Sequence, residues 1–212
     1  QTHFSNYNTR KRLHITLERK NKFMIILTDC DGVLLNWAQS YHWWMHRKGY
    51  KPVRPNEYAM DKCYGIPREE SQQLCSTFCE SAAVGFLPPL RDAVKYVRKL
   101  HEEHGVVFHC ITSMSNDPWS TKLREQNLAR IFGEGVFERV VCLGCGDDKD
   151  EALERYRDSN FMWIEDKPEN AELGADMGLN SFLLNHTYNS DYDLSEDVIR
   201  VNNWKEIYEY VG

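Results

Sequence analysis

The sequence contains no long apolar run, no internal repeat and no low-complexity segment. A helix that spans a bilayer needs about 20 consecutive apolar residues, and the N-terminus has no apolar region of the secretory kind. We therefore expect a soluble, cytoplasmic protein that does not contact a membrane. The lack of a repeat also excludes a fibrous protein. A chain of 212 residues is long enough for one domain with a sizeable core and a small insertion.

An excess of positive charge is also missing. The formal net charge is -6 at pH 7 and the isoelectric point is about 5.8, whereas nucleic-acid backbones attract basic surfaces. General binding of nucleic acid is therefore not expected. The exception is segment 10–22, which carries six basic residues and one acidic residue. We interpret residues 1–22 as a solvated basic arm, with contact to an anionic partner as the alternative.

The cysteines do not form the pattern of a disulfide-rich or zinc-binding fold. Their number, seven, is odd, and they are scattered along the chain. Cys142 and Cys145 form a CxxC motif without a second one, while Cys75 and Cys79 could share a helix face. A structural zinc site usually needs two well-spaced pairs or a histidine partner. We therefore expect mostly reduced thiols and no zinc site.

Short β-rich segments alternate with longer helical patterns over most of the chain. Strands are expected at 23–28, 106–112, 139–143, 161–165 and, as the last one, 181–185; helices are expected at 90–103, 118–132, 147–158 and 168–178. Parallel neighbours require a crossover, and the crossover helices then cover both faces of the sheet. The sequence thus predicts an α/β fold with three layers around a parallel sheet. Trp204 is expected to pack a C-terminal helix onto the core.

Residues 34–87 interrupt this alternation. They contain an aromatic cluster and a helix-like segment, REESQQLCSTFCESAA, but no convincing strand. We interpret them as a small helical cap inserted after the first strand, from which the chain returns through Pro88 and Pro89. The core would then consist of residues 23–33 and 88–212.

Polar residues follow the expected strands. In open α/β sheets, ligands bind outside the carboxyl ends of the strands. Four strand ends bring carboxylates, hydroxyls and one amine to this edge: Asp29, Asp31, Thr112, Ser113, Lys149, Glu165 and Asp166. Clustered carboxylates repel one another unless a cation joins them, and magnesium binds few carboxylates together with water and phosphate oxygens. We therefore expect Mg²⁺ as cofactor and phosphoryl transfer as the chemistry. Taken singly, Thr112, Ser113 and Lys149 could equally be structural.

The sequence DCDGV at 29–33, a strand ending in Thr-Ser, a later lysine and a strand ending in an acidic pair resemble the four motifs of haloacid dehalogenase-like phosphatases. The resemblance covers about residues 23–185. It implies a Rossmann-like sheet with Asp29 as the nucleophile that forms an aspartyl-phosphate. Asp31 would act as general acid and then as base, and its backbone carbonyl would bind the metal. Asp166 would complete the protein ligands of the ion.

The same resemblance implies roles for the other strand-end residues. Thr112 and the Ser113 amide would hold phosphate oxygens, and Lys149 would balance the charge of the nucleophile and the phosphoryl group. Gly32 would let the backbone turn close to the substrate. Glu165 is a further candidate for the metal site, but it departs from the pattern, because related nucleotidases often carry aspartate there. Two roles remain open for it: contact with a metal-bound water, or shaping of the site.

The helical insertion, the phrase VGFLPPL and the terminal VNNWKEI are similar to the 5'(3')-deoxyribonucleotidase branch. This resemblance implies a small phosphoester substrate, a nucleoside monophosphate. Aromatic side chains of the insertion could stack a base, a contact worth about 1–3 kcal/mol; the candidates are Trp37, Trp43, Trp44, Phe78 and Phe86. The alternative is packing within the cap, since Trp37, Tyr41 and Trp44 form one helical stripe while Trp43 lies off it.

Other functions remain open at this stage. One is a phosphatase for sugar phosphates or another small phosphoester, and a second is a nucleic-acid 3'-end phosphatase that uses the basic arm. A receiver-like signalling domain also combines acids, Thr or Ser and Lys around a phosphorylated Asp. Receivers lack a cap and an acid two residues after the nucleophile. Homodimerisation stays open as well.

Overall fold

A computed structural model describes residues 24–212, so the expected basic arm at 1–22 lies outside the described residues. Six parallel strands form one sheet in the order β3-β2-β1-β4-β5-β6. Their bounds are Met24–Thr28 (β1), Val106–Ser113 (β2), Phe137–Leu143 (β3), Met162–Glu165 (β4), Asn180–Leu184 (β5) and Val198–Val201 (β6). The predicted parallel α/β sheet is confirmed.

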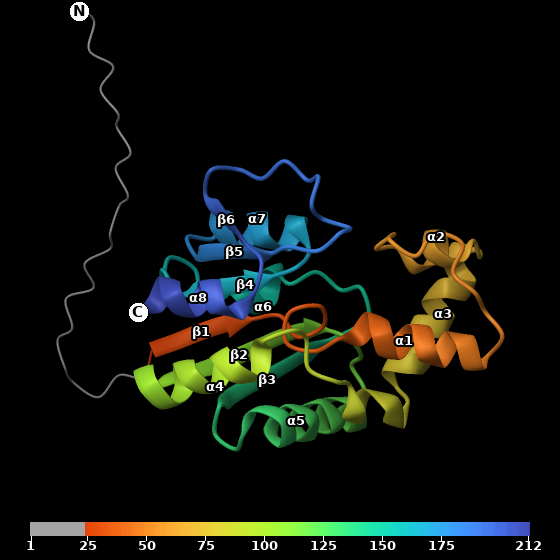
Figure 1. Ribbon diagram of the computed structural model, residues 1–212, viewed down its shortest axis with the longest axis horizontal. Coiled ribbons are helices and arrows are strands. Elements are labelled where there is room, and N and C mark those ends of the chain that lie inside the picture. Colours follow the sequence, from red (N-terminus) through yellow and green to blue (C-terminus); the bar gives the residue numbers. More distant parts are fainter. Residues whose placement is uncertain (1–23) are drawn as a thin grey trace, which may run out of the picture.

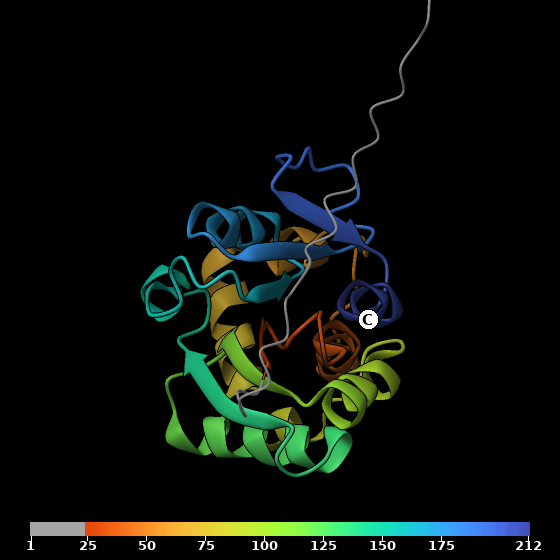
Figure 2. The same cartoon turned by 90° about the vertical axis from the view of Figure 1, so that its left-hand side faces the viewer.

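Helices cover both faces of this sheet, which gives three layers (Figures 1 and 2). One face carries α4 (Ala93–His104), α5 (Pro118–Phe132) and α8 (Trp204–Val211); the other carries α6 (Asp150–Glu154) and α7 (Pro168–Asp176). Burial on both faces explains why β2 reads as an almost continuous apolar run. Within residues 24–212, no helix combines the length and apolarity needed to cross a membrane.

Local sequence signals fix several helix ends. Helix α5 begins at Pro118, and Asp117 caps it by accepting a hydrogen bond from the Ser120 amide at 2.9 Å. The C-terminal helix is anchored by Trp204, which is buried and donates through Nε1 to the Val33 carbonyl at 2.9 Å. The start of α5 at Pro118 and the packing of Trp204 agree with the sequence-based expectations.

Two elements differ from those expectations. The sheet does not end with β5, because β6 adds a short parallel edge strand beyond it. The helix expected at 147–158 is shorter, since α6 spans only Asp150–Glu154 before the chain turns. Asp158 and Asn160 follow with positive φ angles, which a continuing helix cannot accommodate.

The segment between β1 and the return at Pro89 is helical, as expected. It contains α1 (Trp37–Arg47), α2 (Met60–Tyr64), α3 (Arg68–Cys79) and the short 3-10 helix η1 (Ala82–Phe86). Figure 1 shows α1, α2 and α3 beyond the ends to which the strands point. This arrangement places the inserted helices over the edge of the sheet that carries the strand-end residues.

Candidate active site

Three buried carboxyl groups meet at the carboxyl edge of the sheet. Asp29 directly follows β1, Glu165 ends β4, and Asp166 is the next residue. One carboxylate oxygen from each lies within 4.8 Å of the others, and all three residues are buried. Like charges at such distances repel strongly away from water. The cluster therefore needs cations close by.

Lys149 supplies one of these cations. It immediately precedes α6 and is buried, with Nζ 2.7 Å from Glu165 Oε1 and 2.8 Å from Asp29 Oδ1. Asp29 Oδ1 meets Lys149 as an ion pair, and no other donor from the described part of the chain contacts it. Lys149 thus contacts two of the three carboxyl groups, and the cluster stays short of positive charge.

The pKa values reflect this shortage. Burial raises the pKa of Asp29 from 3.8 to about 7, although Lys149 opposes the shift. Burial also raises the pKa of Asp166 well above its usual value, with Glu165 and Asp29 adding to the effect. Burial acts in the same direction on Glu165, but Lys149 and the hydrogen bonds at its carboxylate lower the pKa of that residue overall. Asp29 and Asp166 are therefore the two groups that gain most from a divalent cation.

Glu165 is already fully engaged by protein donors. Its Oε2 accepts from the amides of Asp166 at 2.7 Å and Lys167 at 2.8 Å, and its Oε1 accepts from Asn170 Nδ2 at 2.8 Å and from Lys149. The longer glutamate side chain thus folds back onto the turn that follows β4. This geometry favours the role of shaping the site over contact with a metal.

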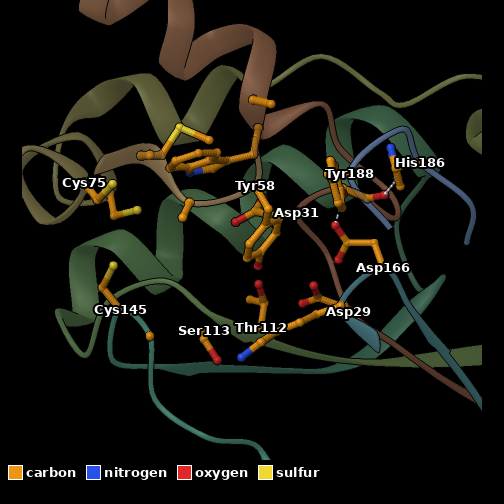
Figure 3. Close-up of a pocket in the computed structure, with 18 of the residues that line it drawn as sticks. Asp29, Asp31, Tyr58, Cys75, Thr112, Ser113, Cys145, Asp166, His186 and Tyr188 are labelled. Carbon is orange, nitrogen blue, oxygen red and sulfur yellow. Dashed lines mark hydrogen bonds between the residues drawn. The ribbon is translucent and has the colours of Figure 1, made fainter. Parts of the chain in front are cut away.

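A cavity of about 560 Å³ lies over this cluster. Thr112, Ser113, Gly32 and Asp31 line it together with the three acids and Lys149, so every core residue expected from the sequence reaches the same space. Thr112 is buried at the end of β2, while the Ser113 hydroxyl donates to the Asp147 carbonyl at 2.8 Å. Figure 3 shows Thr112, Ser113 and Asp29 together at the floor of the cavity.

Comparisons with known proteins agree on the architecture. A haloacid dehalogenase-like family hydrolase from Streptococcus pneumoniae superposes with a TM-score of 0.62 at 12% identity, covering 90% of this chain and 99% of that one. The L-2-haloacid dehalogenase of Xanthobacter autotrophicus superposes with a TM-score of 0.58 at 11% identity, covering 90% of this chain and 98% of that one. The D,D-heptose 1,7-bisphosphate phosphatase of Burkholderia thailandensis superposes with a TM-score of 0.53 at 11% identity, covering 88% of this chain and 96% of that one. The fold is that of haloacid dehalogenase-like hydrolases.

Sequence comparisons add less. No family model matches the chain. A protein of enterobacteria phage T4, described as an uncharacterized 32.4 kDa protein in the Gp30-rIII intergenic region, is 23% identical over 140 residues, or 63% of this chain. That stretch is 49% of the phage protein, so the chain spans about half the length of this relative. The nucleotidase branch expected from the sequence does not appear among the solved structures described above.

The core also contains a site residue that the sequence patterns did not reveal. Arg124 of α5 is 0% exposed, and its guanidinium donates to both carboxylate oxygens of Asp31 at 2.6 and 2.8 Å. The same guanidinium lies against Cys30 Sγ and Met114 Sδ. A signal was present in the sequence, because Arg124 lies four residues before Leu128. Residues four apart share one face of a helix, so the charged Arg124 lies on the same face as an apolar residue. A charged residue on a core-facing stripe needs a partner.

Aromatic side chains near the acids come from loops, and these too were missed. Tyr58 from the segment before α2 meets the Tyr188 ring at 5.1 Å, and Tyr188 stacks on His186 at 4.8 Å. The Tyr188 hydroxyl donates to Asp166 Oδ2, and Figure 3 shows the Tyr58 side chain extending toward the floor of the cavity. Loop residues of this kind carry no periodic pattern by which a sequence could reveal them.

The structure corrects the expectation for most aromatic residues of the insertion. Trp37 lines the cavity, but Trp43, Trp44, Phe78 and Phe86 do not. Phe78 is fully buried, and Trp44 packs against it at 5.6 Å, so both belong to the core of the inserted helices. Trp43 and Phe86 are 68% and 71% exposed on the outer surface. Packing within the inserted helices therefore accounts for Trp44 and Phe78, whereas Trp43 and Phe86 lie on the surface outside the cavity.

Gly32 lies where the backbone approaches the acids. Its φ angle is +81°, and a Cβ atom there would clash with Asp166 Oδ2. Its carbonyl lies 2.7 Å from His186 Nε2. The glycine thus permits both the left-handed turn and the close approach to Asp166.

We expect Gly32→Ala to lower the free energy of unfolding by roughly 2–4 kcal/mol, since it combines a strained φ with a steric clash. Gly105→Ala is the matched control, because Gly105 has a φ of +65° and a methyl group there would have no atom within 4 Å; it should cost about 1 kcal/mol. Chemical denaturation measures both. Equal losses would show that the approach to Asp166 does not constrain position 32.

Proposed function

We propose that this chain is a magnesium-dependent phosphomonoester hydrolase, that Asp29 becomes covalently phosphorylated during turnover, and that nucleoside monophosphates are its substrates. The observation that carries the proposal is the setting of Asp29: a buried carboxylate at the cavity floor, ion-paired with Lys149 and close to Asp166. The haloacid dehalogenase-like fold supports the same reading, since its solved members named above include a phosphatase.

The residues present fit a divalent cation. Beyond the ion pair with Lys149, Asp29 Oδ1 has no hydrogen-bond donor among the described residues, and burial holds the pKa values of Asp29 and Asp166 above their usual range. Asp29 and Asp166 are the carboxylates that would hold magnesium, with the Asp31 carbonyl as a third oxygen. The bound ion would neutralise charge on the phosphoryl oxygens.

The chain's own residues supply the remaining chemistry. An Asp29 oxygen attacks phosphorus while the bond from phosphorus to the ester oxygen breaks, and Asp31 gives that oxygen a proton. Asp31 then takes a proton from water, which attacks phosphorus and releases inorganic phosphate from Asp29. Thr112 and the Ser113 amide hold phosphoryl oxygens, and Lys149 offsets their charge. We propose that residues 34–87 act as a cap that shields these steps from bulk water.

The choice of a nucleotide rests on the cavity wall. Trp37, Tyr58 and Tyr188 line the space above the acids and offer aromatic faces to a base. Asp31 and the inserted helices argue against a receiver-like domain, which has neither. The alternative of a nucleic-acid 3'-end phosphatase relied on the basic arm, which lies outside the described residues.

A sugar phosphate is the second candidate substrate. Polar residues from the inserted segment line the cavity, among them Asn36, Arg68 and Gln72, and such groups suit sugar hydroxyls. The structural similarity to a heptose bisphosphate phosphatase points in the same direction. This candidate shares the Asp29 chemistry and differs only in what the cavity wall recognises.

Phosphate release from an aryl phosphate, with and without magnesium, tests the reaction, and a panel of nucleoside monophosphates and sugar phosphates tests the substrate. We expect magnesium-dependent release and kcat/KM at least about tenfold higher for the best nucleotide than for any sugar phosphate. The reverse preference would replace the nucleotide by a sugar phosphate as substrate. No release from any ester with magnesium present would refute the hydrolase.

Magnesium should raise the thermal midpoint more at about pH 8 than at about pH 5.5. The folded pKa of Asp29 is about 7 against 3.8 for the unconstrained group. The folded protein therefore holds a proton that the unfolded chain has lost, and the metal-free protein loses stability as pH rises from 3.8 to 7. Above pH 7 the carboxylate is ionised in the folded protein, and a bound cation then stabilises the folded protein most.

Thermal scans with and without magnesium at the two pH values measure this difference. The Asp29→Asn variant is the control, and we expect it to show a smaller stabilisation by magnesium. If magnesium raised the thermal midpoint equally at both pH values, or equally in the variant and the unchanged protein, Asp29 would not belong to the metal site.

A further inference from the structure

The loop that follows β5, residues 186–189, packs against the cluster of buried acids. Two of its side chains, His186 and Tyr188, line the cavity, and Figure 3 shows both beside Asp166. The reaction steps proposed above use no residue of this loop. Its hydrogen bonds to the site reach two residues, Asp166 and Gly32.

Tyr188 holds one oxygen of the Asp166 carboxylate. Its hydroxyl donates to Asp166 Oδ2, and the Gly32 backbone packs against the same oxygen, because a Cβ atom at position 32 would clash with it. Figure 3 shows the hydrogen bond as a dashed line, with the second carboxylate oxygen on the side of Asp29. The carboxylate is thus held at one oxygen and presents the other to the space between the acids.

The Tyr188 ring is itself held in place. His186 stacks on it, with ring centroids 4.8 Å apart and an angle of 7° between the ring planes. Arg91 Nη2 lies 3.2 Å from His186 Nδ1, and a guanidinium only donates, so Nδ1 is the acceptor. The imidazole proton is then on Nε2, which donates to the Gly32 carbonyl at 2.7 Å. Both nitrogens of the stacking ring are therefore engaged, and the ring cannot turn without losing these hydrogen bonds.

Asn189 fixes the backbone of the loop. It is buried, and its Nδ2 donates to the Asp166 carbonyl at 2.7 Å and to the Leu184 carbonyl at 3.0 Å. Its Oδ1 accepts from the His186 amide at 2.8 Å. One side chain thus ties the end of β5 and the start of the loop to the residue after β4. The position of Tyr188 relative to Asp166 is therefore fixed through both the backbone and the ring.

We propose that Tyr188 is a positioning residue for the divalent cation, because it fixes the orientation of the Asp166 carboxylate that would hold the ion. This inference rests on the proposed function, in which Asp166 binds magnesium. Loss of a hydrogen-bond partner behind a metal ligand typically costs about 10–100-fold in metal affinity or activity. Without the hydroxyl, the carboxylate must be ordered as the ion binds, which weakens binding. Tyr188 itself touches neither the ion nor the reacting atoms, so saturating magnesium should restore the rate.

Magnesium titrations of the purified full chain, followed through the thermal midpoint without substrate, test this role. We expect Tyr188→Phe to need about tenfold more magnesium than the unchanged protein for the same rise in the midpoint. Tyr192→Phe is the matched control, because Tyr192 is 42% exposed and does not line the cavity. Its titration should match that of the unchanged protein, whereas Asp166→Asn should remove most of the rise.

Steady-state release of phosphate from an aryl phosphate separates positioning of the ion from contact with the substrate. We expect Tyr188→Phe to raise the magnesium concentration that gives half of the maximal rate by about tenfold. At saturating magnesium, kcat should stay within about threefold of the unchanged protein and KM for the ester should be the same. A raised KM with an unchanged magnesium requirement would make Tyr188 a substrate contact and overturn the positioning role.

The thermal titrations also distinguish this inference from the proposed function. If magnesium stabilises the unchanged protein and Tyr188→Phe at the same concentrations, the positioning role is wrong while the metal site stands. The same conclusion follows if the variant has a lower midpoint without magnesium but an unchanged magnesium requirement, since the hydroxyl then acts only on the fold. If magnesium does not stabilise the unchanged protein at any concentration, the proposed metal site is refuted, and the positioning role with it.

Discussion

Replacement of Asp29 by Asn should abolish magnesium-dependent phosphate release, with a loss of about 10⁴-fold or more in kcat. The amide keeps the shape of the side chain but is not a nucleophile, so no covalent phosphate can form. Because Asp29 lies at the cavity floor beside Lys149, no neighbouring carboxylate occupies the same position. Steady-state release of phosphate from an aryl phosphate measures the effect.

The fold should survive this replacement. The raised pKa of Asp29 means that its surroundings disfavour the ionised carboxylate, so a neutral amide should leave the thermal midpoint at about pH 8 unchanged or higher. Asp176→Asn is a matched control, since Asp176 is an exposed residue near the end of α7. It should retain activity. An Asp29→Asn variant that is folded and still active would remove Asp29 from its proposed role.

Replacement of Arg124 by Met should be the second most damaging change. The guanidinium is fully buried and holds both oxygens of Asp31, whose side chain is only 18% exposed. Breaking a buried pair by removing one partner costs about 3–5 kcal/mol of stability. Without its partner, Asp31 also loses the orientation that this pair fixes at the cavity, and because we propose Asp31 as general acid, we expect kcat/KM to fall about 10²–10⁴-fold.

A double-mutant cycle separates positioning from general damage to the fold. If Arg124 acts through Asp31, then Arg124→Met combined with Asp31→Asn should be no less active than the poorer single variant. Lys122→Met removes the same charge from an exposed position of α5 and should have little effect on either quantity. Additive losses in activity would show that Arg124 acts independently of Asp31. Activity is compared at a temperature where all variants are folded.

The strand-end residues could be predicted because their placement depends on short-range pattern. Asp29, Thr112 and Glu165 each end or follow an apolar strand, and parallel strands present these ends at one edge of the sheet. Once the alternation of strands and helices is recognised, the convergence of the site follows from topology alone. The haloacid dehalogenase-like fold found in the structure confirms that topology.

Residues whose role depends on long-range packing could not be predicted in this way. Arg124 and Asp31 are 93 positions apart in the sequence. The residues of α5 therefore give no indication that Asp31 is the partner of Arg124. Tyr58 and Tyr188 belong to loops, whose paths depend on what they pack against rather than on periodicity. Strand β6 was missed because it is a four-residue edge strand with polar flanks.

For the aromatic residues of the insertion, residue type alone does not predict whether a side chain packs in the core or lines the cavity. A tryptophan stabilises a helical core as readily as it stacks on a base, so composition alone does not distinguish the two. The stripe of Trp37, Tyr41 and Trp44 indicated packing correctly, and Tyr41 is fully buried. Trp43 lies off the stripe and is exposed rather than turned into the cavity.

The covalent phosphate on Asp29 is the central claim, and rapid quenching of the Asp31→Asn variant tests it most directly. This variant can accept the phosphoryl group but lacks the base that activates water for its removal. After mixing with magnesium and an aryl phosphate labelled at phosphorus, acid quenching and peptide mapping should find the label on the peptide that contains Asp29. Label on any other peptide, or phosphate release by this variant without label on the protein, would contradict the account.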